Sequence, residues 1–196
     1  MFKYIDKPDL PQEIIDQIRL IILQHESNAG LEEFQNNQLD SNIITQLEKC
    51  YSDNKTGLGL DFDTAYQYSG LASFTIIKVQ GPVLDWVLKN IDNNIDGLHI
   101  QVIKGEYVFP HVDALRTNAW NYIIDSGDAD TCFYEPKAEF SNLPLYPVTY
   151  VPYDRVNKIQ TYKIESKRWH CLDVSKMHGV ENIKSIRIAL SISFVR

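Results

Sequence analysis

The second half of the chain consists almost entirely of short segments in which apolar and polar residues alternate. Alternation with a period of two is typical of β-strands that bury one face. Turn signals such as Lys104-Gly105 and Ser126-Gly127-Asp128 separate the segments. Many short strands joined by turns favour an antiparallel sandwich or barrel. Strands are predicted at residues 98–104, 107–112, 119–124, 131–134, 160–164, 169–174 and 185–194.

The first half of the chain carries helical patterns instead. Ile14, Ile15, Ile18 and Ile22 recur at helical spacing and predict a helix over residues 12–24. Further helices are predicted at 41–50 and 83–91, and a strand at 73–80. We therefore expect one α+β domain, in which residues 1–97 form a helical and strand support region and residues 98–196 form the β core.

Net charge and cysteine content limit the cellular compartments and the classes of binding partner to be expected. The net charge is −7 and the pI about 5.2, a balance that disfavours nucleic acids and anionic membranes as partners. Cys50, Cys132 and Cys171 are widely spread and form no CxxC pair. The N-terminus has no apolar core of a signal peptide, and the longest aliphatic run, 18–23, is too short to span a bilayer. We expect a cytoplasmic protein.

Four residues suggest metal and anion chemistry. His111 and Asp113 are two apart on a predicted strand, so their side chains point to the same face. His178 precedes the last predicted strand. Two imidazoles and one carboxylate form the facial triad of non-haem Fe(II) oxygenases. Arg187 begins the final apolar strand, where a buried guanidinium is costly unless it meets an anion such as a dicarboxylate.

These residues lie in segments that resemble a known family. HVDALRTNAWNYII, DADTCFYEP and WHCLDVSKMHGVENIKSIRIALSISF are similar to the double-stranded β-helix core of Fe(II)/2-oxoglutarate-dependent dioxygenases, nearest to the prolyl and aspartyl/asparaginyl hydroxylases. The resemblance covers residues 98–194. It implies a jelly-roll, cupin-like core with the N-terminal helices packed on it. It also implies Fe(II) bound by His111, Asp113 and His178.

The resemblance implies a reaction as well. Arg187 would hold the distal carboxylate of the co-substrate 2-oxoglutarate. O2 would be consumed, an amino-acid side chain or small metabolite would be hydroxylated, and succinate and CO2 would be released. Many members carry a serine two residues after this arginine, where the present chain has Ala189. Tyr122 or Thr131 is therefore the candidate for the second contact to 2-oxoglutarate.

The segment 135–158 is rich in proline and tyrosine and lies between predicted strands. Such a segment is either a lid or binding loop, or a packed surface loop. As a binding loop it would border the mouth of the site, with Tyr146 and Tyr150 as substrate contacts. Arg116 either pairs with an acidic substrate group or is a surface residue. His99 and His170 are interpreted as core or surface histidines.

Two other functions stay open at the level of the sequence. A cupin-like metal protein would use the triad without 2-oxoglutarate, which leaves Arg187 without a role. A non-catalytic interaction module would use the barrel only to display the segment 135–158. The substrate class is open between a small molecule and a protein side chain, and the sequence does not set the oligomeric state.

Overall fold

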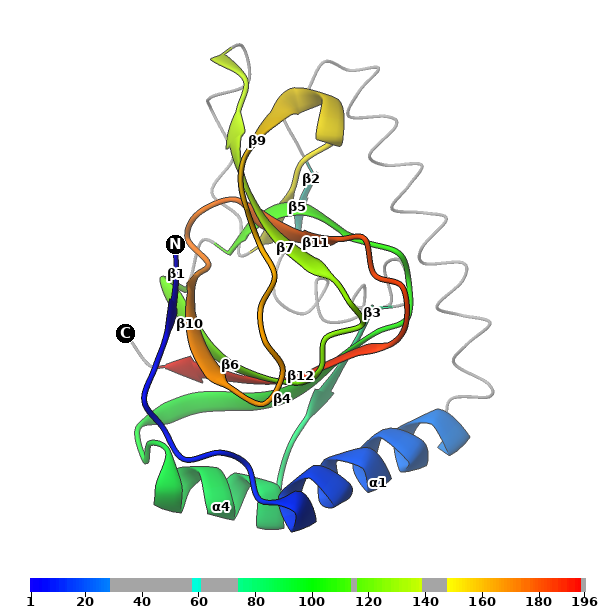
Figure 1. Cartoon of the computed structure of the whole chain (residues 1–196), viewed down its shortest axis with the longest axis vertical. Helices are drawn as coiled ribbons and strands as arrows, with labels where there is room; N and C mark the ends of the chain where they lie inside the picture. Colours follow the sequence, from blue (N-terminus) through cyan, green and yellow to red (C-terminus); the bar gives the residue numbers. More distant parts are fainter. Residues whose placement is uncertain (29–57, 61–73, 114–115, 139–147, 195–196) are drawn as a thin grey trace.

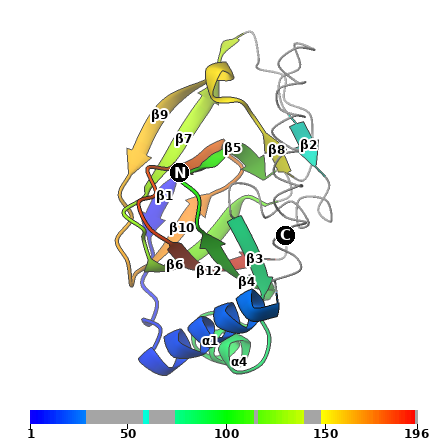
Figure 2. The same cartoon turned by 90° about the vertical axis from the view of Figure 1, so that its right-hand side faces the viewer.

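The computed structural model describes residues 1–28, 58–60, 74–113, 116–138 and 148–194. Within these residues two six-stranded antiparallel sheets face each other (Figures 1 and 2). Sheet A has the order β1 (Phe2–Tyr4), β10 (Trp169–Asp173), β6 (Asn118–Asp125), β12 (Arg187–Phe194), β4 (Ile95–Ile103) and β3 (Phe74–Lys78). Sheet B has the order β2 (Leu58–Leu60), β8 (Val148–Tyr150), β5 (Val108–Asp113), β11 (His178–Glu181), β7 (Asp130–Pro136) and β9 (Val156–Tyr162).

The path of the chain through these strands defines the fold. The chain alternates between sheets A and B along β4, β5, β6 and β7, and it alternates again along β9, β10, β11 and β12. The returning strands insert between the outgoing ones, so that β12 lies between β4 and β6, and β11 between β5 and β7. This winding is the double-stranded β-helix, or jelly roll, of cupin-like proteins, and it confirms the predicted fold class.

In the described part of the chain two helices lie against the outer face of sheet A, as Figure 1 shows. α1 (Gln12–Asn28) and α4 (Pro82–Asn90) match two of the predicted helices. Their apolar faces form one buried cluster with the strands, to which Ile18, Val87, Ile100 and Leu190 belong. Because alternate residues of the same strands point the other way, the helices leave the inner face of sheet A free to line a site. No described helix is both long and apolar enough to cross a bilayer.

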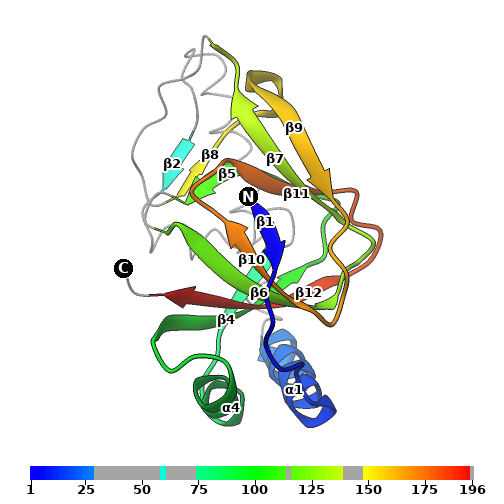
Figure 3. The same cartoon turned by 60° about the vertical axis from the view of Figure 1, so that its left-hand side comes forward.

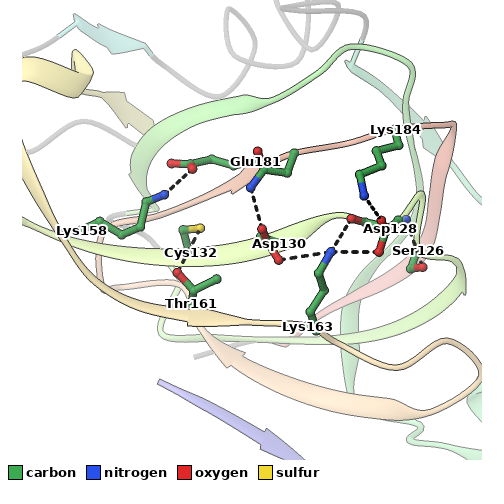
Figure 4. Close-up of polar contacts among 10 residues, drawn as sticks. Ser126, Asp128, Asp130, Cys132, Lys158, Thr161, Lys163, Glu181 and Lys184 are labelled. Atoms are coloured by element: carbon green, nitrogen blue, oxygen red, sulfur yellow. Dashed lines mark hydrogen bonds and ion pairs between the residues drawn. The ribbon is translucent and has the colours of Figure 1, made fainter.

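Charged side chains cover part of sheet B on the side of β7, β9 and β11 drawn in Figure 4. Lys163 Nζ lies 2.9 Å from Asp128 Oδ1 and 3.3 Å from Asp130 Oδ1. Lys158 pairs with Glu181 on the same sheet. Both lysines are more than 40% exposed, so each pair adds at most about 1 kcal/mol to stability.

Four short strands were not predicted. β1, β2 and β8 have three residues each and β11 has four, too few for an alternating pattern to emerge. β8 lies inside the proline-rich segment, where proline and tyrosine dominate the composition. The predicted helix at 41–50 lies outside the described residues.

Candidate active site

A cavity of about 150 Å³ is lined by residues from both sheets. The strands that enclose it face each other in Figure 3, with β5, β7 and β11 on one side and β4, β6 and β12 on the other. Sheet B contributes the candidate metal ligands together with Thr131 and Tyr150. Sheet A contributes Arg187 and several further polar side chains.

His111 and His178 lie directly opposite each other on the paired strands β5 and β11. Their ring centroids are 4.2 Å apart. His111 Nδ1 lies 2.8 Å from the carbonyl oxygen of Phe109, and His178 Nδ1 lies 2.9 Å from that of Lys176. A carbonyl oxygen only accepts, so each Nδ1 donates and each Nε2 keeps its lone pair. Metal-binding histidines are oriented in the same way.

Two features of the backbone bring the histidines together. Between His178 and Val180 the register slips, so that two residues of β5, Phe109 and Pro110, oppose the single residue Gly179 of β11. This bulge contains Pro110, which cannot donate a strand hydrogen bond, and it turns Val108 and His111 toward the same cavity. Gly179 permits the close approach of the strands, because a Cβ there would lie 2.8 Å from the carbonyl oxygen of Val108.

Asp113 ends β5, lines the same cavity as His111 and is only 4% exposed. Arg116 donates from Nη2 to Asp113 Oδ2 over 2.5 Å and from Nη1 to Ser193 Oγ over 3.0 Å. Burial alone raises the pKa of the Asp113 carboxyl, but Arg116, followed by His111 and His178, outweighs burial and lowers it. The carboxylate is therefore ionised at pH 7, as metal binding requires.

These side chains have the chemistry of a metal site but are not preassembled as one. No three His, Cys, Asp or Glu side chains in the described part of the chain form a metal-binding group. Arg116 occupies one oxygen of Asp113, so an ion must use the other oxygen or displace Arg116. Burial, with a contribution from His111, lowers the pKa of His178 to about 3, and the neutral ring is the form that binds metal. The donor set fits Fe(II) and similar divalent ions.

Arg187 is the first residue of β12, lines the same cavity and is 8% exposed. Burial lowers the pKa of its guanidinium to about 10. Among the described residues no carboxylate forms an ion pair with it. A buried cation without a counter-ion is costly, and a bound anion would offset that cost. The cavity therefore holds a site for a carboxylate or another small anion.

The other predicted site residues divide into two groups. Thr131 and Tyr150 line the cavity and are buried, and the Tyr150 ring centroid lies 5.3 Å from that of His111. Tyr122 points to the other face of sheet A. It belongs to the cluster beneath the helices, and its hydroxyl bonds to Asp9 and to the backbone of Leu10. Tyr122 therefore packs beneath the helices and does not line the cavity in which the sequence analysis expected it to contact 2-oxoglutarate.

Among the described residues of the segment 135–158, those of β8 adjoin the cavity and those near Tyr153 do not. β8 pairs with β5, with Tyr150 opposite His111. A few residues later, Tyr153 stacks outside the cavity lining, with ring centroids 5.8 Å from Phe109 and 6.2 Å from Tyr134. Tyr146 lies outside the described residues. The segment thus contributes one described tyrosine to the site and packs another on the outside of the sheet.

Sequence reasoning missed most of the polar residues on the sheet A wall. The cavity lining includes His99, Asn121, His170 and Ser191. The two histidines were interpreted as ordinary core or surface residues, but both face the cavity. The available signal was the alternation on β4, where Leu98 and Ile100 belong to the apolar face and His99 lies between them.

Comparison with known proteins adds little at the level of sequence. No protein-family model matches the chain, and no curated protein matches it. Three solved structures illustrate the distant likeness. Oxalate decarboxylase from Bacillus subtilis is 12% identical at a TM-score of 0.33, over 62% of this chain and 25% of that one. E. coli YcfD is 14% identical at 0.37, over 58% and 30%.

The third structure is an RmlC-like cupin protein from Desulfovibrio desulfuricans. It is 10% identical at a TM-score of 0.31, over 61% of this chain and 81% of that one. The chain thus spans about a quarter of oxalate decarboxylase and under a third of YcfD. At TM-scores this low no activity is inferred from these likenesses, and the fold stands on the strand order described above.

Proposed function

We propose that the chain is an Fe(II)- and 2-oxoglutarate-dependent oxygenase that hydroxylates an amino-acid side chain or a small metabolite. The observation that carries the proposal is Arg187, a buried cation without an acidic partner among the described residues, in the same cavity as His111, Asp113 and His178. A metal site alone explains the histidines and the aspartate. It does not explain a cation that needs an anion beside them.

The residues divide the work of binding. His111 and His178 would hold iron through Nε2, and Asp113 through a carboxylate oxygen. Arg187 would bind the distal carboxylate of 2-oxoglutarate in a two-pronged contact, and the hydroxyl of Thr131, which lines the same cavity, would make the second contact. Bound iron and 2-oxoglutarate together supply the O2-activating chemistry, with succinate and CO2 as co-products.

The remaining wall excludes water and orients the ligands. Val108, Val180 and Ala189 make part of the lining apolar. A dry wall strengthens the attraction between Arg187 and a carboxylate, because the local dielectric is low. Arg116 holds Asp113 ionised when no metal is bound and must release at least part of that carboxylate to an ion.

Anaerobic titration tests the proposal. The chain is loaded with Fe(II), 2-oxoglutarate is added, and the visible spectrum is recorded. The proposal expects a weak charge-transfer band in the wild type and none in Arg187→Met at the same concentrations. Lys163→Met, which removes an exposed cation instead, is the matched control and should keep the band. Iron binding without any response to 2-oxoglutarate would indicate a cupin-like metal protein instead.

A further inference from the structure

Four polar side chains form a row across the inner face of sheet A. His99 on β4 is paired with Ser191 on β12, Ser191 with Asn121 on β6, and Asn121 with His170 on β10. All four line the cavity. Residues directly opposite on neighbouring antiparallel strands have adjacent side chains. The row is therefore a continuous polar strip across four strands of a wall that is otherwise largely apolar.

Three members of the row have unused hydrogen-bonding atoms. Asn121 is 8% exposed, Ser191 2% and His170 1%. Asn121 Oδ1, Ser191 Oγ and His170 Nδ1 are buried, and none has a hydrogen bond of ordinary geometry in the described structure; the His170 ring keeps a weaker contact with the Arg168 backbone. A buried polar atom without a partner is destabilising, and such atoms in one cavity indicate a ligand or bound water. Three such atoms in one row form a polar surface that can hydrogen-bond to a ligand.

The row carries no charge at neutral pH. Burial, with a contribution from Arg187, lowers the pKa of His170 to about 3, and burial with Arg116 and Lys78 lowers that of His99 to about 4. Asn121 and Ser191 are neutral in any case. An uncharged strip with donors and acceptors suits an uncharged polar group better than an anion.

Along β12 the row is offset from the anion-binding end of the cavity, although Arg187 is near enough to His170 to act on it electrostatically. Ser191 follows Arg187 by four residues, which is about 13 Å along an extended strand. Ser193, two residues beyond Ser191, accepts the hydrogen bond from the same Arg116 that holds Asp113. The row therefore lies nearer to the candidate metal ligands than the backbone of Arg187 does.

We propose that the row of His99, Ser191, Asn121 and His170 binds an uncharged hydrogen-bonding group, a carboxamide or a hydroxyl, of a ligand distinct from the anion at Arg187. That this ligand is the substrate of an oxygenase rests on the proposed function. The binding of the neutral group does not, because it requires neither metal nor 2-oxoglutarate.

Acetamide and acetate, which have nearly the same shape and differ in charge, separate the two subsites. Each is titrated into the metal-free chain and followed by heteronuclear NMR. Acetamide should lose about 2- to 10-fold in affinity in Asn121→Leu, the effect of one lost hydrogen bond. It should bind normally to Asn118→Leu, a control on the same strand outside the cavity lining. Acetate binding should depend on Arg187 and be indifferent to Asn121→Leu.

Thermal unfolding separates a binding role from a structural one. If the row is kept for a ligand, Asn121→Leu and Ser191→Ala should leave Tm unchanged or raise it by roughly 2–4 °C. The proposal is overturned if acetamide fails to bind the wild type, if it binds Asn121→Leu equally well, or if both variants lower Tm or fail to fold. If the wild type binds acetamide but not acetate, the result counts against the anion site and the proposed function. It does not count against the binding of a neutral group by the row.

Discussion

Replacement of Arg187 by methionine should stabilise the ligand-free chain while removing its response to 2-oxoglutarate. Burial lowers the pKa of the guanidinium well below its ordinary value, to about 10. At about 1.36 kcal/mol per pKa unit, the buried charge costs up to about 3 kcal/mol of folding free energy at pH 7. Methionine keeps much of the apolar stem without the charge. For a chain of this length the gain corresponds to a rise in Tm of roughly 6–12 °C.

2-Oxoglutarate should stabilise the wild type much more than it stabilises Arg187→Met. With Mn(II) present throughout, 2-oxoglutarate at 100 times its Kd stabilises the wild type by about 2.7 kcal/mol. Losing one partner of a buried charge pair costs about 2–5 kcal/mol of affinity. At the same concentration the variant should therefore gain less than about 1 kcal/mol. Differential scanning fluorimetry with Lys163→Met as control measures both effects. A lower Tm in Arg187→Met, together with an equal gain from 2-oxoglutarate, would refute the reasoning.

Three further predictions follow from the site. His111→Ala and His178→Ala should each weaken Mn(II) binding at least about 100-fold in calorimetric titration, and unchanged affinity in both would remove the metal assignment. Gly179→Ala should cost about 1–3 kcal/mol in urea unfolding and weaken Mn(II) binding too, because its Cβ meets the Val108 carbonyl; a neutral result would mean that β11 shifts freely. His170 has a pKa of about 3 in the folded chain, whereas an unperturbed histidine has a pKa of about 6.5, so its contribution to stability is present above pH 6.5 and lost as pH falls toward 3. Between pH 7 and 5 the wild type should lose about 2 kcal/mol more than His170→Gln, and parallel curves would contradict this.

Most of the fold could be predicted from hydrophobic periodicity. The helix at 12–24 and the strand at 119–124 appear as α1 and β6 with small changes in their ends. Strands of three or four residues carry too little pattern to be recognised, and β8 and β11 are defined by their pairing with β5 rather than by their own sequence. A local sequence pattern does not show which distant strands will pair, so strands that depend on such pairing are missed.

Spacing along one strand was enough to predict which side chains share the cavity. His111 and Asp113 are two apart on one strand, and both line the cavity. The difference at Tyr122 has a physical cause, because β6 is buried on both faces and alternation cannot then distinguish the cavity side from the helix side. Asn121, the neighbouring residue, faces the cavity instead. The same limitation concealed His170.

One measurement tests the central claim most directly. It is a crystal structure of the chain in complex with Mn(II), in place of Fe(II), and 2-oxoglutarate, with the crystals grown in the absence of O2. The account predicts one ion bound to His111 Nε2, His178 Nε2 and a carboxylate oxygen of Asp113. It also predicts the co-substrate's keto acid end on the ion and its distal carboxylate on Arg187. An ion elsewhere, or a distal carboxylate that makes no contact with Arg187, would contradict the account.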